Sequence, residues 1–130
     1  MAQKTVIDAS VAVKWFLTEP GSVEARALRD AHQREAFLIA PDLILAETLN
    51  TLRYKGSDLR LALEALMSEQ LRLVRLDIRL LDAACALALE HGLSIYDALY
   101  AAVAARYGAV LVTADRDFAQ MPGVRMLGEV

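Results

Sequence analysis

Short apolar segments alternate with longer helical segments along this chain, and that alternation constrains the fold more than any other feature. Strand-like segments occur at residues 4–7, 37–40, 71–76, 109–112 and 124–127. Helical patterns occupy residues 10–17, 22–35, 42–55, 59–69, 78–91 and 94–107. Pro41 suits the first turn of the third of these helices, where its missing N–H needs no partner. Strands separated by helices predict an α/β domain with a mainly parallel sheet and helices on both faces. Ligands bind outside the carboxyl ends of the strands in such sheets.

The size of the chain suits one domain, which we expect to span residues 1–130. The longest uncharged apolar run, residues 98–105, is far shorter than the ~18 residues that a membrane-spanning helix needs. Asp8 interrupts the N-terminal region before a signal-type apolar segment can form, so we expect a cytoplasmic protein. The single cysteine, Cys85, cannot form an internal disulfide, and we expect it to be a small buried hydrophobe.

The charge balance argues against a broad nucleic-acid-binding surface. The formal net charge is −3 and the isoelectric point is near 5.3, whereas such surfaces are usually basic. Local phosphate contacts stay possible, because a divalent cation can supply positive charge to an acidic site.

Carboxylates stand where the predicted sheet would direct its ligands. Asp8 ends the first strand, and Asp115 and Asp117 follow the fourth. Glu47 lies among apolar residues of one helix, and Asp97 lies in the first turn of the most apolar helix. If these side chains converge from separate segments, their charges repel one another unless a cation binds them.

Each of these acids also has a purely structural interpretation. Asp8 can cap the helix that starts near residue 10, and Asp97 with the serine three residues before it matches a capping box. Thr113 or Asp115 can cap a short helix at residues 117–120, and Glu47 can lie on an exposed stripe of its helix. Local sequence leaves both interpretations open.

Several motifs, in a fixed order, carry a resemblance to a known family. They are VIDASV near the start, PDLILAETLN in the first third, LSIYDALYAAVAARYGAVLVTADRDF near the end, and a short closing strand. With these motifs the chain resembles the PIN-domain nucleases, and most closely the toxin members of bacterial VapBC toxin–antitoxin pairs. The resemblance covers essentially the whole chain.

The resemblance implies a fold and an activity. The implied fold is a single-domain, three-layer α/β/α structure with a mainly parallel sheet of about five strands. The implied function is that of a metal-dependent endoribonuclease toxin, which hydrolyses RNA with a metal-activated water. It also implies a homodimer and a tightly bound antitoxin.

Matched residue by residue, the family's acidic metal ligands and catalytic residues fall on Asp8, Glu47, Asp97 and Asp115. The supporting positions fall on Ser10, Thr113 and Asp117. Hard oxygen ligands of this kind select Mg²⁺ or Mn²⁺, whereas zinc favours the His and Cys that are scarce here.

The pair Asp115 and Asp117 calls for a choice between its members. Residues two apart in a turn point in different directions, so we expect only one of them to lie near the metal. Asp115 is closer to the strand end and matches the family's ligand position. We therefore expect Asp117 to accept N–H groups of the next turn or to hold a water.

Two other classes of protein compete with a nuclease. A signalling receiver domain has a similar length, a parallel α/β fold and Mg²⁺-binding acids. Its pattern, however, needs paired acids after the first strand and a lysine after the fifth, whereas the last lysine here is Lys55. The second competitor is a PIN-like protein that has lost catalysis and serves only as a binding partner, although all four acids are present.

Overall fold

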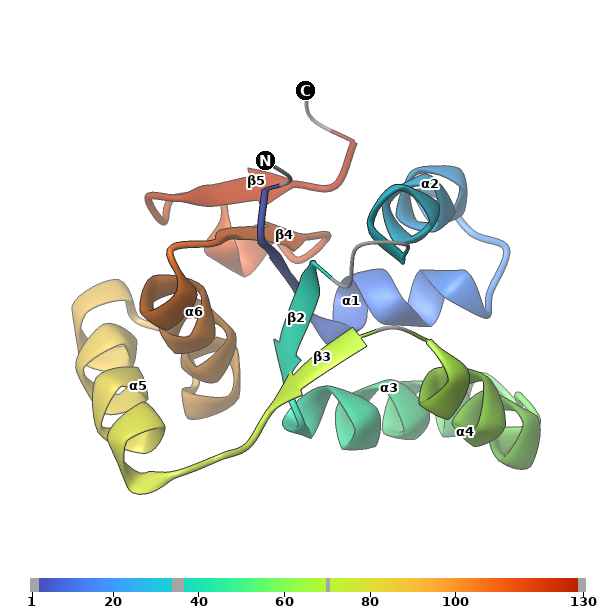
Figure 1. Cartoon of the computed structure of the whole chain (residues 1–130), viewed down its shortest axis with the longest axis horizontal. Helices are drawn as coiled ribbons and strands as arrows, with labels where there is room; N and C mark the ends of the chain where they lie inside the picture. The colour runs from blue at the N-terminus through green and yellow to red at the C-terminus, as the bar shows by residue number, and fades with distance from the viewer. Residues whose placement is uncertain (1–2, 34–36, 70, 129–130) are drawn as a thin grey trace.

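A parallel five-stranded sheet forms the centre of the protein in a computed structural model, which describes residues 3–33, 37–69 and 71–128. The strands run in the order β3-β2-β1-β4-β5 (Figure 1), and every pairing between neighbours is parallel. The strands are β1 (Thr5–Ile7), β2 (Leu38–Pro41), β3 (Leu71–Val74), β4 (Val110–Thr113) and β5 (Val124–Met126). The predicted α/β fold class, with about five mainly parallel strands, is confirmed.

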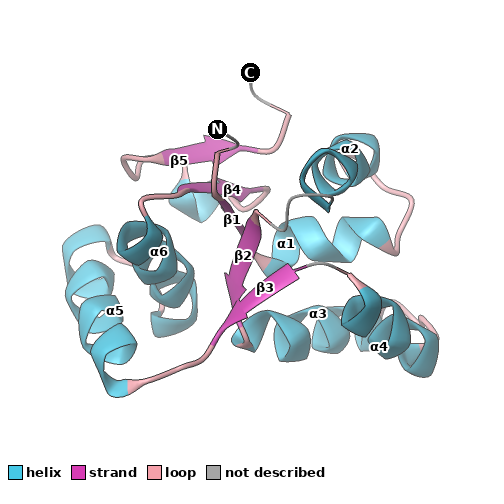
Figure 2. Cartoon of the chain, viewed as in Figure 1, coloured by secondary structure: helices cyan, strands magenta, loops and turns pink. Residues whose placement is uncertain are grey.

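Helices cover both faces of this sheet. In Figures 1 and 2, α5 and α6 lie on one side and α1 to α4 on the other. The α-helices are α1 (Ala9–Ala12), α2 (Ser22–Gln33), α3 (Leu43–Tyr54), α4 (Leu59–Ser68), α5 (Ile78–His91) and α6 (Ile95–Tyr107). Two single-turn 3₁₀ helices are η1 (Val13–Trp15) and η2 (Arg116–Phe118). The three layers agree with the predicted α/β/α arrangement.

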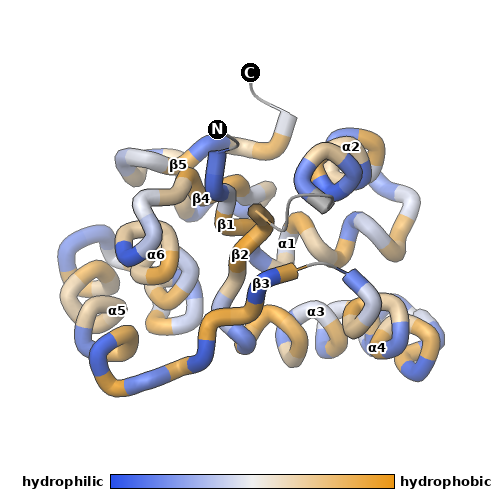
Figure 3. The backbone as a smooth tube through the Cα atoms, in the orientation of Figure 1, coloured by the Kyte–Doolittle hydropathy of each residue, from blue (hydrophilic) through white to orange (hydrophobic). Residues whose placement is uncertain are grey.

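The main core extends over both faces of the sheet, and α6 is its most deeply buried helix. Residues 98–104 of α6 are all buried, because α6 contacts β1, β2 and β4 on one side and α5 on the other. A helix that is apolar on every side is stable only when it is enclosed in this way. Figure 3 shows most of β2 as hydrophobic, whereas α2 and α4 alternate in character. The burial of α6 places its polar first turn, with Asp97, at the carboxyl end of the sheet.

Most helix boundaries follow from local signals. The predicted helix Ile78–His91 is confirmed, with Asp77 accepting a hydrogen bond from the Leu80 N–H (2.8 Å) and Gly92 ending the helix at φ +67°. Glycine adopts this left-handed conformation without the steric cost that a side chain imposes. The helix predicted at 22–35 is confirmed to Gln33, and its last two positions lie outside the described residues.

Two local predictions were wrong. We expected Pro41 in the first turn of a helix, but it ends β2 in register with Val74. The next N–H, that of Asp42, donates to the Val74 carbonyl (2.9 Å), so the chain stays beside β3 before α3 begins. Cys85 is exposed rather than buried, because α5 turns Leu80 and Ala84 toward the core and leaves Cys85 on its outer side. Within the described residues, no helix has the length and apolar character that crossing a membrane requires.

Candidate functional site

The site begins where two adjacent strands end. β1 and β4 pair in parallel, with Ile7 opposite Val112, so the residues that follow them emerge at the same edge of the sheet. Asp8 follows β1, and Thr113 and Asp115 lie at and just beyond the end of β4. Asp8 and Thr113 are 105 positions apart in the sequence but lie in contact. The hydroxyl of Thr113 donates a 2.5 Å hydrogen bond to Asp8 Oδ2.

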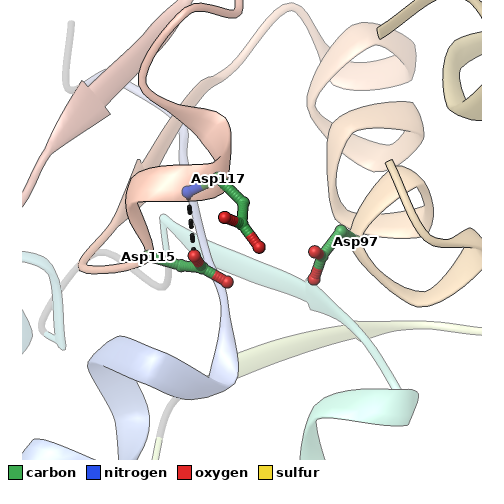
Figure 4. Close-up of side chains that lie close together, drawn as sticks. All are labelled: Asp97, Asp115 and Asp117. Atoms are coloured by element: carbon green, nitrogen blue, oxygen red, sulfur yellow. Dashed lines mark hydrogen bonds between the residues drawn. The ribbon is translucent and has the colours of Figure 1, made fainter. Parts of the chain in front are cut away.

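Three carboxylates gather beside this edge. Asp97, Asp115 and Asp117 each offer an oxygen, and these oxygens lie within 4.8 Å of one another. Figure 4 shows Asp97 reaching from α6 toward Asp115 and Asp117 on the η2 segment. Asp97 and Asp115 are partly buried, and Asp117 is exposed.

The grouping of Asp115 with Asp117 differs from our expectation that the two would point in different directions. The cause is η2, a tight turn in which Asp115 is the N-cap and accepts a hydrogen bond from the Asp117 N–H (2.9 Å). A 3₁₀ turn closes over three residues rather than the 3.6 of an α-helix. Asp115 thus caps η2 and faces Asp97 at the same time, and Asp117 is turned toward the same point (Figure 4).

Asp8 is the buried anchor of the site. Its side chain is 4% exposed, and one oxygen accepts from the Ser10 hydroxyl and the other from the Thr113 hydroxyl, each at 2.5 Å. The two hydroxyls accept in turn from the backbone after β4: Ser10 from the Ala114 N–H and Thr113 from the Asp115 N–H, both at 2.9 Å. Asp8 therefore fixes the backbone that carries Asp115, and its side chain makes no cap bond to α1.

The environment of Asp8 disfavours its charged form. Burial raises the pKa of Asp8 from 3.8 to about 6, and the nearby charge of Asp115 acts in the same direction. The hydrogen bonds from Ser10 and Thr113 lower the pKa and offset only part of this effect. A cation close to Asp8 and Asp115 would favour the charged form.

Glu47 approaches the site from α3. One of its oxygens accepts a hydrogen bond from the Tyr100 hydroxyl (2.6 Å), and Tyr100 itself is 1% exposed. Burial first, and then this hydrogen bond, raise the pKa of Tyr100 well above its ordinary value, so the hydroxyl stays protonated and donates. Glu47 is half-buried rather than on a fully exposed stripe.

Tyr100 is a site residue that our sequence analysis missed. The available signal was its position in a wholly apolar helix, where the phenol hydroxyl of a buried tyrosine needs a partner. It follows Asp97 by three positions, so its side chain lies on the same side of α6 as that acid.

Asp97 uses its backbone N–H in the helix cap and its carboxylate in the acidic group. Its N–H donates to the Ser94 hydroxyl (3.0 Å), which is the predicted cap, while its carboxylate faces the other acids. Burial raises the pKa of Asp97, and the charges of Asp115, Glu47 and Asp117 raise it further. The predicted cap is therefore confirmed, and it uses the backbone N–H of Asp97, so that the carboxylate can still face the other acids.

The donor set of this group fits a hard divalent cation. It consists of carboxylate oxygens, which Mg²⁺ and Mn²⁺ prefer, and contains no His or Cys. Among the residues that the structure describes, no Lys, Arg or His forms an ion pair with any of the five site acids, Asp8, Glu47, Asp97, Asp115 and Asp117. A bound cation would therefore relieve the mutual repulsion of these acids. Asp8 and Glu47 flank the three-carboxylate group rather than join it.

Comparison with known proteins identifies the family. The model of the PIN domain matches residues 5–124. The chain belongs to the PIN domain family. A curated relative, ribonuclease VapC3 of Pyrobaculum aerophilum, is 33% identical over 127 residues, which cover 90% of this chain and 93% of the relative. This membership removes the receiver-domain alternative.

Solved structures share the PIN fold over nearly the whole chain. A toxin–antitoxin complex from Klebsiella pneumoniae matches with a TM-score of 0.73 at 21% identity, covering 97% of this chain and 99% of that one. VapC20 of Mycobacterium tuberculosis, a toxin that cleaves the sarcin–ricin loop, also matches with a TM-score of 0.73 at 21% identity, covering 91% and 95%. At this identity the likeness shows the fold.

Proposed function

We propose that this PIN domain is a metal-dependent endoribonuclease and the toxin of a toxin–antitoxin pair. The observation that carries the proposal is the group of Asp97, Asp115 and Asp117 at the carboxyl end of the parallel sheet, with oxygens within 4.8 Å of one another. The relative named as a ribonuclease supports it, because it matches nearly the full length of both chains. The reaction is hydrolysis of an RNA phosphodiester bond.

The cation of this site is Mg²⁺ or Mn²⁺ in our proposal. Asp8, Glu47, Asp97 and Asp115 are its acidic residues, and the position of Asp117 in the group supports a direct part for it as well. When bound, the cation would polarise the scissile phosphate and lower the pKa of an attacking water.

The chain's own residues hold this arrangement in place. Through their hydroxyls, Ser10 and Thr113 connect Asp8 to the backbone N–H groups of Ala114 and Asp115, respectively. Tyr100 fixes one oxygen of Glu47 by donating a hydrogen bond to it. Because these groups are positioned before a substrate arrives, little reorganisation is needed at the moment of reaction.

The proposal extends to the setting of the protein. Residues 1–130 act as one nuclease domain in the cytoplasm, as a homodimer whose site a cognate antitoxin blocks. The solved toxin–antitoxin complex with the same fold supports an antitoxin partner. The curated ribonuclease relative supports RNA as the substrate.

A cleavage assay with Glu47→Gln tests the proposed activity. The amide keeps the size of the side chain and removes its charge. We expect cleavage of single-stranded RNA to fall by at least ~100-fold, because residues that only support a metal ligand already cost up to about that much when they are changed. We expect no large change in thermal stability. Glu64→Gln is the matched control, because Glu64 is exposed on α4, where it pairs with Arg60.

Two results would contradict the proposal. If the wild-type protein cleaves no RNA with Mg²⁺ or Mn²⁺ present, the protein is a catalytically inactive PIN-like binding protein. If wild-type cleavage survives a chelator, or Glu47→Gln cleaves as well as Glu64→Gln, the proposed role of the cation or of Glu47 is wrong.

A further inference from the structure

A small pocket opens directly beside the acidic site. It has a volume of about 260 Å³ and is lined by Leu43, Ala46, Glu47, Asn50 and Tyr96. The first four lie at positions 43, 46, 47 and 50 of α3, a spacing that puts them on one face of a helix. Tyr96 adds the first turn of α6 as the opposite wall.

Two residues of the pocket wall connect it to the acidic site. Glu47 lines the pocket and also accepts the hydrogen bond from Tyr100 next to the acids. Tyr96 directly precedes Asp97, whose carboxylate belongs to the three-carboxylate group. The pocket therefore adjoins the acidic site along α3 and the first turn of α6.

The lining has the chemistry of a base-binding pocket rather than a phosphate-binding one. It carries no Lys or Arg, and Glu47 would repel a phosphate. Tyr96 is 60% exposed, so its phenol ring is accessible to a flat ligand. Among the described residues, neither the Tyr96 hydroxyl nor the Asn50 amide has a hydrogen-bond partner, so both are free to contact a ligand.

We infer that Tyr96 and Asn50 form a subsite for one unpaired nucleobase of the RNA, adjacent to the phosphate that is cleaved. The base stacks on the ring of Tyr96, lies against Leu43 and Ala46, and is read at its edge by the Asn50 amide. Stacking on aromatic side chains and hydrogen bonds to base edges are the usual means of recognising single-stranded RNA. The inference rests on the proposed ribonuclease function and adds a specificity-determining pocket to it.

The first test compares substitutions at Tyr96. Tyr96→Ala should lower kcat/KM for a labelled single-stranded RNA on the order of 5- to 140-fold, the range expected for loss of one stacked base. Tyr96→Phe should keep most of the activity, because it keeps the ring. Tyr54→Ala is the matched control, since Tyr54 is an exposed tyrosine at the far end of α3 that lines no part of the pocket.

The second test asks which nucleotide the ring contacts. Abasic substitutions are placed one at a time around the mapped cleavage position and assayed with wild type and with Tyr96→Ala. At one position the abasic RNA should slow wild type at least as much as Tyr96→Ala does, and should slow Tyr96→Ala much less than it slows wild type, because the two changes share the stacking contact. Asn50→Ala should alter the base preference at that same position.

The outcomes separate the subsite from the function. If wild type cleaves RNA and Tyr96→Ala cleaves it equally well, or if no abasic position couples to Tyr96, the subsite is wrong and the ribonuclease function stands. Such a result would leave the pocket to a side chain of a protein partner. If wild type cleaves no RNA, both proposals fail. Metal titration of Tyr96→Ala should match wild type; a weakened metal response would show that the variant acts through Asp97, and would also overturn the subsite.

Discussion

At the scale of single residues, Asp115 does two jobs that sequence analysis treats as alternatives. Its Oδ1 caps η2 by accepting from the Asp117 N–H, and its carboxylate lies within the three-carboxylate group. The backbone N–H of Asp115 is itself held by Thr113. The N–H of Asp117 is held by Asp115, but its side chain is exposed and accepts no hydrogen bond from the described residues. The two acids are therefore neighbours in the site but differ in how firmly they are positioned.

This difference predicts unequal losses of metal affinity. Asp115→Asn should nearly abolish RNA cleavage and weaken Mg²⁺ or Mn²⁺ binding strongly, because it removes the better-positioned charge. Asp117→Asn should weaken metal binding less, by about 10- to 100-fold. Calorimetric metal titrations of the two variants and wild type measure both effects. A larger loss in Asp117→Asn would reverse the ranking of the two acids.

The buried carboxylate of Asp8 predicts a pH dependence of stability. Its folded pKa of about 6 lies above its ordinary value of 3.8, so the native state binds the proton more tightly than the unfolded state does. The resulting stabilisation is fully present below the unfolded pKa and is lost as the pH rises through about 6.

Asp8→Asn lacks this proton and should escape the loss. In metal-free buffer, the free energy of unfolding of the variant relative to wild type should increase by up to roughly 3 kcal/mol between acidic and neutral pH. Denaturant unfolding of both proteins across this range provides the measurement, and groups common to the two cancel in the difference. A difference that does not change with pH would show that Asp8 titrates near its ordinary value in the folded protein.

At the scale of elements, the first turn of α6 connects local helix stability to the site. Ser94 caps this helix by accepting from the N–H of Asp97, so the cap holds the residue that carries a site carboxylate. α4 has an equivalent cap at Asp58, which accepts from the N–H groups of Arg60 and Leu61. That second cap supports no site residue.

Removing the two caps should therefore have one shared and one distinct effect. Ser94→Ala and Asp58→Ala should each lower the free energy of unfolding by about 1 kcal/mol, the usual value of a helix cap. Only Ser94→Ala should also weaken metal binding, because fraying of the first turn releases Asp97. Equal metal affinities in the two variants would mean that packing alone holds Asp97.

The sequence was most informative where an element carries its own start and stop signals. α5 was predicted residue for residue because Gly92 ends it where the periodic pattern stops. Pro41 was misplaced because a proline fits both a helix start and a strand end, and only the pairing of β2 with β3 distinguishes them. The exposure of Cys85 depends on which side of α5 faces α6, and two apolar sides of a helix look alike in sequence.

The site shows the same division between local and tertiary information. The acids themselves were found from their places after strands and in apolar helices. Their convergence was also expected, but the place of Asp117 in the group was not, because the 3₁₀ turn that brings Asp117 beside Asp115 depends on a hydrogen bond between the two residues. The donation from Tyr100 to Glu47 joins residues 53 positions apart, a distance that no local pattern spans.

At the scale of the whole molecule, the acids predict that metal binding stabilises the protein. A cation that binds only the native state raises stability by mass action, by about 2.7 kcal/mol at a concentration 100 times its dissociation constant. The melting temperature of wild type should rise by several degrees with saturating Mg²⁺ or Mn²⁺. Asp97→Asn should show a smaller rise with its fold intact by circular dichroism. An unchanged metal response in this variant would exclude Asp97 as a ligand.

The pairing of β1 with β4 also determines when, during synthesis of the chain, the acidic site can form. Asp8 leaves the ribosome early, but its partner Thr113 and the group around Asp115 are made near the end of synthesis. A nascent chain that stops before Thr113 lacks the strand end on which the acids assemble. Contacts between such distant segments also form slowly during folding. Truncated products of translation therefore lack the assembled acidic site, and the full chain acquires it only when folding pairs β1 with β4.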